Sequence, residues 1–116
     1  MLPFDRKIVG VDLKRSSLVN VTFSDRSLEE LESNPDFKSK FDGSVVRGFR
    51  KTMNFIRSAN DERDLYSWPG GRLEALKGDR SHQYSFRINQ QWRLIVEFQK
   101  GEPKNTVHVV EIVDYH

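Results

Sequence analysis

The stretch from Tyr84 to Phe98, YSFRINQQWRLIVEF, decides the fold class of this chain. Apolar and polar residues alternate along both of its halves, on either side of a short turn at Gln90-Gln91. A period of two on both sides of a tight turn predicts a β-hairpin with one apolar and one polar face. Two further strands are expected: Val107 to Val113 (VHVVEIV), apolar on both faces as a central strand is, and the shorter Arg72 to Lys77 (RLEALK).

The residues before this hairpin predict one more strand and two helices. Alternation over Leu18 to Phe23 (LVNVTF) indicates the strand. Ser27-Leu28-Glu29-Glu30 has the pattern of a capping box and predicts the start of a short helix, which Asn34-Pro35 ends. An amphipathic helix follows Gly43, where apolar residues recur at helical spacing (Val46, Phe49, Met53 and Ile56). We therefore expect an α+β domain, with two N-terminal helices packed on one face of a mainly antiparallel sheet of four or five strands.

Composition limits the class of protein. A chain of 116 residues has the size of one domain. It contains no cysteine, which excludes disulfides, thiolate metal sites and cysteine nucleophiles. No apolar run is long enough to cross a membrane, and the charges within Met1 to Gly10 are unlike a signal peptide. We therefore expect a cytoplasmic protein that does not bind a membrane.

Basic residues are concentrated in one block of the chain. The formal net charge is only +2, but Gly70 to Lys100 holds six basic residues against three acidic ones. Within this block, the alternation places Arg87 and Arg93 on the polar face of the hairpin. If the helices cover the apolar face, both guanidinium groups are open to solvent, where their planar donors suit a phosphodiester. The alternative is that they form surface salt bridges with carboxylates of the same block (Glu74, Asp79 or Glu97).

The chain ends with three groups that can transfer or hold protons, Asp114, Tyr115 and His116. They directly follow the expected central strand, which should hold them in place; the alternative is a frayed terminus. An unperturbed imidazole titrates at about pH 6.5, which suits general acid–base catalysis. The other two histidines, His82 and His108, lack the spacing of metal ligands, and we expect neither a metal site nor a cofactor.

Four blocks of this sequence resemble the HigB branch of the RelE/ParE toxin superfamily, also called plasmid maintenance killer proteins. These blocks are RLEALKGDR (72–80), YSFRIN (84–89), QWRL (91–94) and the closing VEIVDYH (110–116). The match is detailed there and looser from Leu18 onward. It implies a RelE-like toxin domain over residues 18–116, preceded by an N-terminal extension at residues 1–17.

The resemblance implies the toxin of a type II toxin–antitoxin system, acting as a ribosome-dependent mRNA endonuclease that inhibits translation. In the implied reaction, which uses no metal, the ribose 2′-OH attacks the adjacent phosphorus. The products are a 2′,3′-cyclic phosphate and a 5′-OH. Such a step needs a base for the 2′-OH, an acid for the 5′-oxygen and cations for the phosphate charge.

The resemblance also implies roles for residues of this chain. The implied catalytic residues are His116 for proton transfer, Tyr115 for base stacking or proton transfer, Asp114 for orientation, and Arg93 and Lys77 for the phosphate. The candidate RNA-binding residues are Arg72, Arg80 and Arg87. Some members have a histidine where this chain has Glu74, so Glu74 is a second candidate base.

The implied partners are a helix-turn-helix antitoxin, the ribosome and mRNA. The basic face of the expected long helix (Arg47, Arg50, Lys51 and Arg57) is either a solvated surface or a docking surface for an acidic partner. We predict that the antitoxin contacts this helical half and blocks entry to the ribosome by its bulk. Two other functions fit the same fold: a ParE-like toxin that inhibits DNA gyrase without catalysis, and an inactive relative that only binds its antitoxin.

Overall fold

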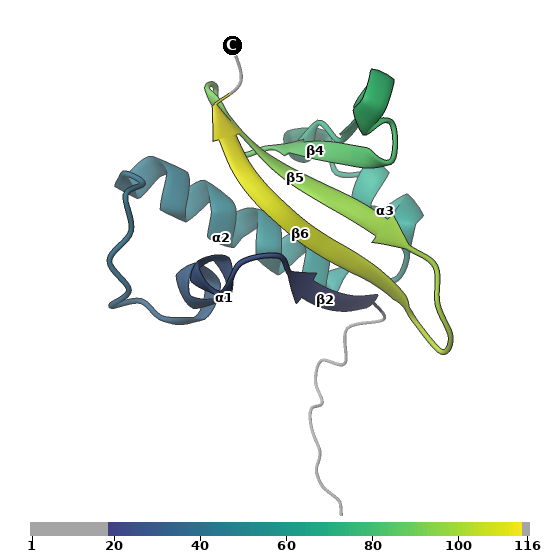
Figure 1. The fold of residues 1–116 in the computed structure, drawn as a ribbon, viewed down its shortest axis with the longest axis horizontal. Coiled ribbons are helices and arrows are strands. Elements are labelled where there is room, and N and C mark those ends of the chain that lie inside the picture. Colours follow the sequence, from purple (N-terminus) through teal and green to yellow (C-terminus); the bar gives the residue numbers. More distant parts are fainter. Residues whose placement is uncertain (1–18, 115–116) are drawn as a thin grey trace, which may run out of the picture.

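The computed structural model describes residues 19–114 of this protein (Figure 1). In chain order its elements are β2 (Val19–Phe23), α1 (Arg26–Ser33), α2 (Gly43–Ser58), α3 (Glu62–Tyr66), the 3-10 turn η1 (Pro69–Gly71), β3 (Glu74–Ala75), the 3-10 turn η2 (Gly78–Arg80), β4 (Gln83–Arg87), β5 (Trp92–Gln99) and β6 (Asn105–Asp114). The predicted extension at residues 1–17 and the catalytic candidates Tyr115 and His116 lie outside the described residues.

The strands form one five-stranded sheet in the order β2-β6-β5-β4-β3. β4 and β5 form the hairpin that the alternation predicts, with Phe86 opposite Leu94. β6 lies between β5 and β2, as Figure 1 shows, so the prediction of a central strand is confirmed. β5 and β6 run antiparallel, whereas β2 and β6 run parallel.

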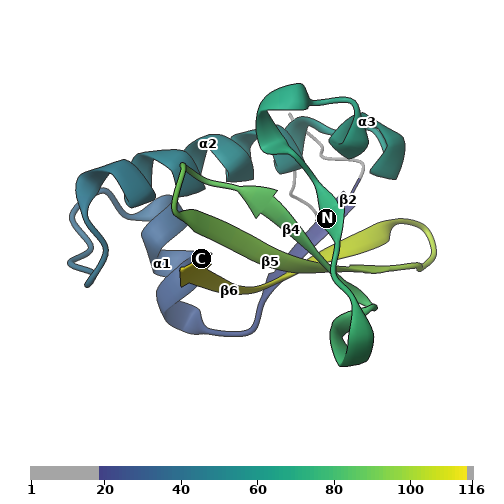
Figure 2. The ribbon, with the colours of Figure 1, turned by 90° about the horizontal axis from the view of Figure 1, so that it is seen from above.

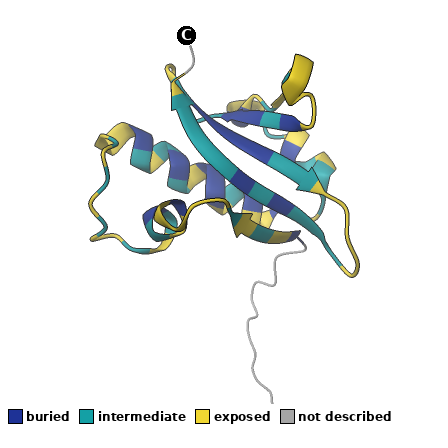
Figure 3. Cartoon of the chain, viewed as in Figure 1, coloured by how far each residue is buried: buried dark blue, intermediate teal, exposed yellow. Residues whose placement is uncertain are grey.

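The helices α2 and α3 lie over one face of the sheet, and Figure 2 shows the other face uncovered by either. The core forms between α2 and the sheet, where Phe49 and Met53 of α2 are fully buried with Phe86 and Leu94. In Figure 3 the buried residues follow the inner side of α2 and the middle of β4, β5 and β6. Among the described residues, no helix is long and apolar enough to span a bilayer.

The fold predicted from the sequence is wrong in two respects. The described chain has three helices rather than two, and the sheet is mixed because β2 pairs in parallel with β6. Alternation shows that a strand has a buried face, but it carries no information on the direction of the neighbouring strand. The third helix has only five residues, too few to show a helical period.

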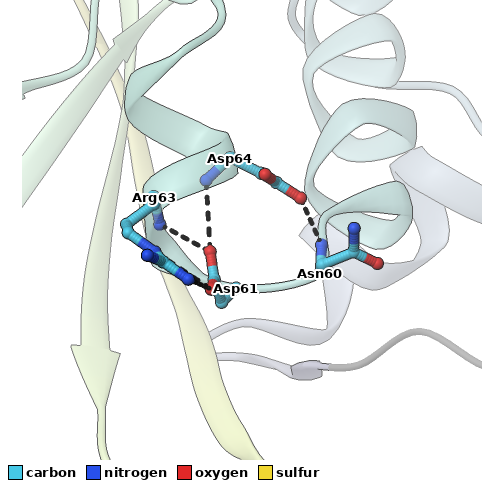
Figure 4. A network of polar contacts seen from close by, with 4 residues as sticks. All are labelled: Asn60, Asp61, Arg63 and Asp64. Atoms are coloured by element: carbon cyan, nitrogen blue, oxygen red, sulfur yellow. Dashed lines mark hydrogen bonds and ion pairs between the residues drawn. The ribbon is translucent and has the colours of Figure 1, made fainter.

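This short helix α3 is held at its start by polar contacts (Figure 4). The Asp61 carboxylate accepts hydrogen bonds from the backbone N–H groups of Arg63 and Asp64, and it forms an ion pair with the Arg63 side chain at 3.0 Å. Asp64 in turn accepts from the backbone N–H of Asn60 at 2.8 Å. These contacts satisfy backbone donors that the first turn of a helix leaves unpaired.

Aspartates also begin the other two helices. Asp25 caps α1, two residues before the cap predicted at Ser27, and the backbone N–H of Ser27 donates to the Asp25 carboxylate. Asp42 caps α2 by accepting from the backbone N–H groups of Ser44 and Val45. The chain leaves α1 at Asn34, as predicted from Asn34-Pro35.

Two arginines of the predicted basic face join α2 to α1. Arg57 forms a bidentate pair with Glu32, at 2.5 and 2.8 Å. Arg50 donates to the carbonyl oxygens of Leu31 and Asn34, at the C-terminal end of α1. The side chains of Arg50 and Arg57 therefore hold α2 against α1. The other two residues of the predicted basic face, Arg47 and Lys51, make no such contact with α1 within residues 19–114.

Candidate functional site

The sheet face opposite α2 and α3 carries most of the predicted site residues. Arg87 of β4 lies directly opposite Arg93 of β5, and Arg93 is paired on its other side with Val113 of β6. Two like charges in one cross-strand pair are unfavourable in an ordinary sheet. Departures from local preference of this kind are concentrated at functional sites, which makes the Arg87–Arg93 pair a candidate site.

Arg93 itself is buried, with only 6% of its surface exposed. Its guanidinium donates to the Ser85 hydroxyl from Nε at 3.2 Å and from Nη2 at 2.8 Å. Nη2 also donates to the carbonyl oxygens of Ser85, at 3.2 Å, and of Arg72, at 2.8 Å. The prediction that this guanidinium is open to solvent is therefore wrong, because the chain around Arg72 crosses over it.

The backbone of Arg72 adopts an unusual conformation that this contact explains. Arg72 has φ 43° and ψ 53°, in the left-handed region that non-glycine residues rarely occupy. This geometry follows the 3-10 turn η1 and directs the Arg72 carbonyl oxygen to Arg93 Nη2, while Arg72 as a whole is exposed. Strained backbone persists where the surroundings hold it in place, and it is concentrated at functional sites.

Glu74 is the acidic neighbour of Arg93. It lies on β3, paired with Ser85 of β4, and its Oε1 is 3.6 Å from Arg93 Nη2. The Glu74 side chain is 60% exposed. The carboxylate therefore lies at the surface of the polar face, beside the buried cation. This position suits the role of second candidate base.

The other predicted cations differ in how they are held. Arg80 is paired with Glu111 at 2.8 Å and donates to Gln83 at 2.7 Å. Arg87 is half-buried, and its Nε lies 3.4 Å from the Asn89 carbonyl oxygen. Lys77 is exposed just after β3, and no ion-pair partner occurs for it within residues 19–114.

Asp114 is the last described residue and sits at the end of β6. It pairs with Trp92 of β5, one position beyond the pair of Val113 with Arg93. Successive residues of a strand point to opposite faces, so Asp114 belongs to the face of Trp92 and not to that of Arg93. Its carboxylate accepts a hydrogen bond from Gln91 at 3.0 Å. Asp114 is thus close to Arg93 along the β5–β6 ladder, but the two side chains lie on opposite faces of the sheet.

A second polar cluster on the open face was missed by the sequence analysis. Glu97 accepts a hydrogen bond from Gln83 at 2.9 Å, lies 3.5 Å from His82, and is opposite His108 in the β5–β6 ladder. The hydrogen bond from Gln83, with the two imidazoles nearby, holds the pKa of Glu97 below its usual range. His108 is in turn 2.7 Å from the Thr22 hydroxyl. In the sequence, the polar residues of β4 and β5 occupy alternate positions and so lie on one face of the hairpin. This alternation could have predicted the cluster.

Several solved structures have the same fold as this chain. The YoeB/ParE toxin from Agrobacterium tumefaciens matches 84% of this chain and 100% of its own, with a TM-score of 0.54 and 18% identity. A chain of a YoeB–YefM complex from Staphylococcus aureus matches 84% of this chain and 97% of its own length, with a TM-score of 0.52 and 21% identity. At these identities the likeness shows the fold alone.

Sequence relatives narrow the class to a family. The model of the family described as "RelE-like toxin of type II toxin-antitoxin system HigB" matches residues 21–116. Toxin HigB-1 from Vibrio cholerae serotype O1 is 30% identical over 84 residues, which cover 72% of this chain and 88% of that protein. An uncharacterized protein from Haemophilus influenzae is 28% identical over 83 residues. This chain belongs to the family of HigB-like toxins of type II toxin–antitoxin systems.

Proposed function

We propose that this toxin cleaves mRNA on the ribosome by attack of the ribose 2′-OH on the adjacent phosphorus. One observation carries the proposal: Arg87 and Arg93 form one cross-strand pair at the end of the sheet where β6 reaches Asp114, and hydrogen bonds hold the buried Arg93 guanidinium beneath the Arg72 backbone. Two adjacent cations suit the phosphate, whose negative charge increases in the transition state. Hydrogen bonds hold Arg93 before RNA binds, so little reorganisation is needed.

The proposed reaction moves one proton from the 2′-OH and one to the leaving oxygen. A base removes the 2′-OH proton as the oxygen attacks phosphorus, and the bond from phosphorus to the 5′-oxygen breaks. An acid then protonates the 5′-oxygen. We assign proton transfer to His116 with Tyr115, on the resemblance in sequence, and Glu74 is the alternative base because it is exposed beside Arg93. Asp114 has a supporting role through orientation of the chain end.

Exposed cations around Arg93 would bind the RNA backbone. Arg72 and Lys77 flank β3, and both are exposed. Arg80 is also partly exposed, but its pairing with Glu111 leaves it a weaker candidate than the other two. The polar face also carries Glu74, Glu97 and Glu111, which oppose the binding of free RNA. We therefore expect the ribosome to supply the positioning, which can contribute about 7–11 kcal/mol to lowering a barrier.

The test is a reconstituted translation reaction with mapping of the mRNA ends. The expected result is cleavage of ribosome-bound mRNA, with 2′,3′-cyclic phosphate ends, and almost none of naked mRNA at the same toxin concentration. Cleavage should persist when a chelator is added at a level that leaves ribosomes intact. Loss of cleavage with the chelator, or efficient cutting of naked mRNA, would contradict the proposal.

Variants separate catalysis from binding. Removal of His116 alone should reduce the cleavage rate by about 10²–10⁴-fold, the usual contribution of a general acid or base. The matched control is Lys104→Ala in the β5–β6 loop, which should cleave at the normal rate. If the shortened toxin keeps full activity, Glu74→Gln should be inactive. A parallel gyrase supercoiling assay covers the ParE-like alternative, which predicts inhibition of gyrase without any cut in mRNA.

A further inference from the structure

The loop between α1 and α2 has a hollow on each side. One, of about 380 Å³, lies between the loop and the start of α2. The other, of about 260 Å³, lies between the loop and α1. Phe37 and Phe41 line both hollows, with Lys38 and Ser39 between them. The loop is thus a ridge between two hollows, of which the one toward α1 is mainly apolar and the one toward α2 is mixed. We call the two hollows together the loop groove.

The loop groove is held in shape by contacts of the ridge itself. The Phe41 ring packs edge-on against Trp92 of β5, with 5.6 Å between ring centroids. The backbone N–H of Phe41 donates to the Ser39 hydroxyl, and that of Phe37 donates to the Asn34 carbonyl oxygen. Arg50 fixes the same Asn34 from α2. A groove with its walls already held costs little ordering when a partner binds.

The charged residues that line the groove are all basic. The basic members are Lys38, Lys40, Arg47 and Arg50. Arg50 is committed to the end of α1, whereas the other three are exposed. Asp42 follows the ridge, but its carboxylate caps α2 and is engaged with backbone N–H groups there. The lining therefore presents three exposed positive charges beside the apolar side chains of Phe37, Phe41 and Val46, whereas Asp36 of the same loop is exposed but does not line either hollow.

We infer that the loop groove is the docking site for an acidic amphipathic helix of the antitoxin. An apolar floor with a charged rim is the surface that a helix with one apolar face and flanking carboxylates fits. Nucleic acid fits it less well, because most of its contacts are made through phosphates, which gain nothing from Phe37, Phe41 and Val46. The docking itself rests on membership of a toxin–antitoxin family, whereas the mode of inhibition described next rests on the proposed action at the ribosome.

The groove also lies close to the end of the sheet where the proposed reaction takes place. Phe41 contacts Trp92, and Trp92 is paired with Asp114 in the β5–β6 ladder. A helix seated in the groove would therefore lie beside the end of β6, and its bulk would hinder docking of this end of the toxin onto the ribosome. Inhibition would then need no contact with Arg93 on the opposite face.

The test uses the full toxin with its antitoxin in a titration that gives Kd. The double variant Lys38→Glu/Arg47→Glu should weaken binding at least about tenfold, most strongly at low salt where screening is least. The matched control is Lys51→Glu, an exposed cation on the same helix that does not line the groove, and its Kd should stay within about twofold. Thermal unfolding verifies that both variants fold.

Two further measurements decide between outcomes. Hydrogen exchange in the complex should show protection over residues 34–47, and the double variant should still cleave ribosome-bound mRNA at the normal rate. Equal weakening by the control variant, or protection confined to β3 and β4, would overturn the inference. It would also fail if the double variant bound antitoxin normally but lost affinity for a single-stranded RNA oligonucleotide, since the groove would then be an RNA surface. Absence of nuclease activity in the parental toxin would count against the proposed function alone.

Discussion

The candidate site depends most on the side chain of Arg93. Because this side chain is buried, it has a structural role as well as its proposed role in binding. A surface arginine offers its charge and its hydrogen-bond donors to a ligand, whereas Arg93 already donates to the Ser85 hydroxyl and to the Arg72 carbonyl oxygen. It therefore holds the strained backbone at Arg72, from which β3 and Lys77 follow. Removing Arg93 should disturb the whole 72–77 segment as well as the charge at the phosphate. Loss of activity in Arg93→Ala would thus not by itself prove contact with RNA.

Ser85 gives a sharper test of this arrangement. Ser85 is 1% exposed and accepts from both Nε and Nη2 of Arg93. Ser85→Ala should lower the free energy of unfolding by about 1–3 kcal/mol, because a buried charged group loses an acceptor. It should also slow mRNA cleavage while leaving the Arg93 charge in place. Urea unfolding and the cleavage assay measure the two effects.

The control for this change is Ser33→Ala. The Ser33 hydroxyl is exposed and donates to Glu29 within its own helix, so the change should stay within about 0.5 kcal/mol. If Ser85→Ala is as mild as the control in both assays, Arg93 is held by its other contacts and Ser85 has no positioning role.

At the scale of elements, a close contact between α2 and the β4–β5 hairpin sets the distance between the helix and the sheet. The closest point is Gly48, where a Cβ atom would lie 2.5 Å from both Cγ2 and the carbonyl oxygen of Ile88. Ile88 follows β4, and its N–H is bonded to the Trp92 carbonyl at the hairpin turn. The helix therefore rests directly on the backbone of the turn that separates Arg87 from Arg93.

Gly48→Ala should accordingly destabilise the protein even though alanine favours helices. The gain in helix propensity is about 1 kcal/mol, and the clash with Ile88 backbone, which cannot move aside easily, should exceed it by about 1–2 kcal/mol. The matched change on the same helix is Gly43→Ala, where the added Cβ meets only the flexible end of Arg47. In thermal unfolding, Gly48→Ala should lower Tm, whereas Gly43→Ala should leave Tm unchanged or raise it. A stabilised Gly48→Ala would show that α2 is not seated as described.

At the scale of the whole molecule, an aspartate caps each of the three helices found in residues 19–114, which links global stability to pH. The pKa values of Asp25, Asp42 and Asp61 are held below their ordinary 3.8, chiefly by hydrogen bonds from Ser27, Ser44 and Arg63 respectively. A carboxylate with a lowered pKa in the folded state stabilises fully above its unfolded pKa. This stabilisation is lost as the pH falls through the lower folded value.

The free energy of unfolding should therefore be level at mildly acidic pH and fall once the pH drops below about 3.8. Asp42→Asn should reduce this fall, because asparagine also caps a helix but does not titrate. Asp36→Asn, at an exposed residue of the α1–α2 loop that caps no helix, is the control. Urea midpoints at pH 7 and pH 3 give the comparison. An identical acid dependence in Asp42→Asn and the unaltered protein would contradict this account.

Sequence alone determined the elements whose pattern lies within one segment. The alternation over Tyr84 to Phe98 gave the hairpin and its polar face, the double apolar parity of Val107 to Val113 gave the central strand, and the helical stripe gave α2. The C-terminal blocks determined the family. Each of these signals is a property of consecutive residues, and needs no knowledge of what lies across from them.

Only the tertiary structure decided the direction of paired strands, the burial of individual side chains and the residues that they contact. The parallel pairing of β2 with β6, the burial of Arg93 beneath the Arg72 backbone, and the engagement of Arg50 and Arg57 with α1 all join residues far apart in sequence. Alternation assigns a side chain to a face, but the chain that crosses that face decides whether the side chain meets solvent. A basic stripe likewise shows where cations lie, while the neighbouring helix determines which of them remain exposed to bind a partner.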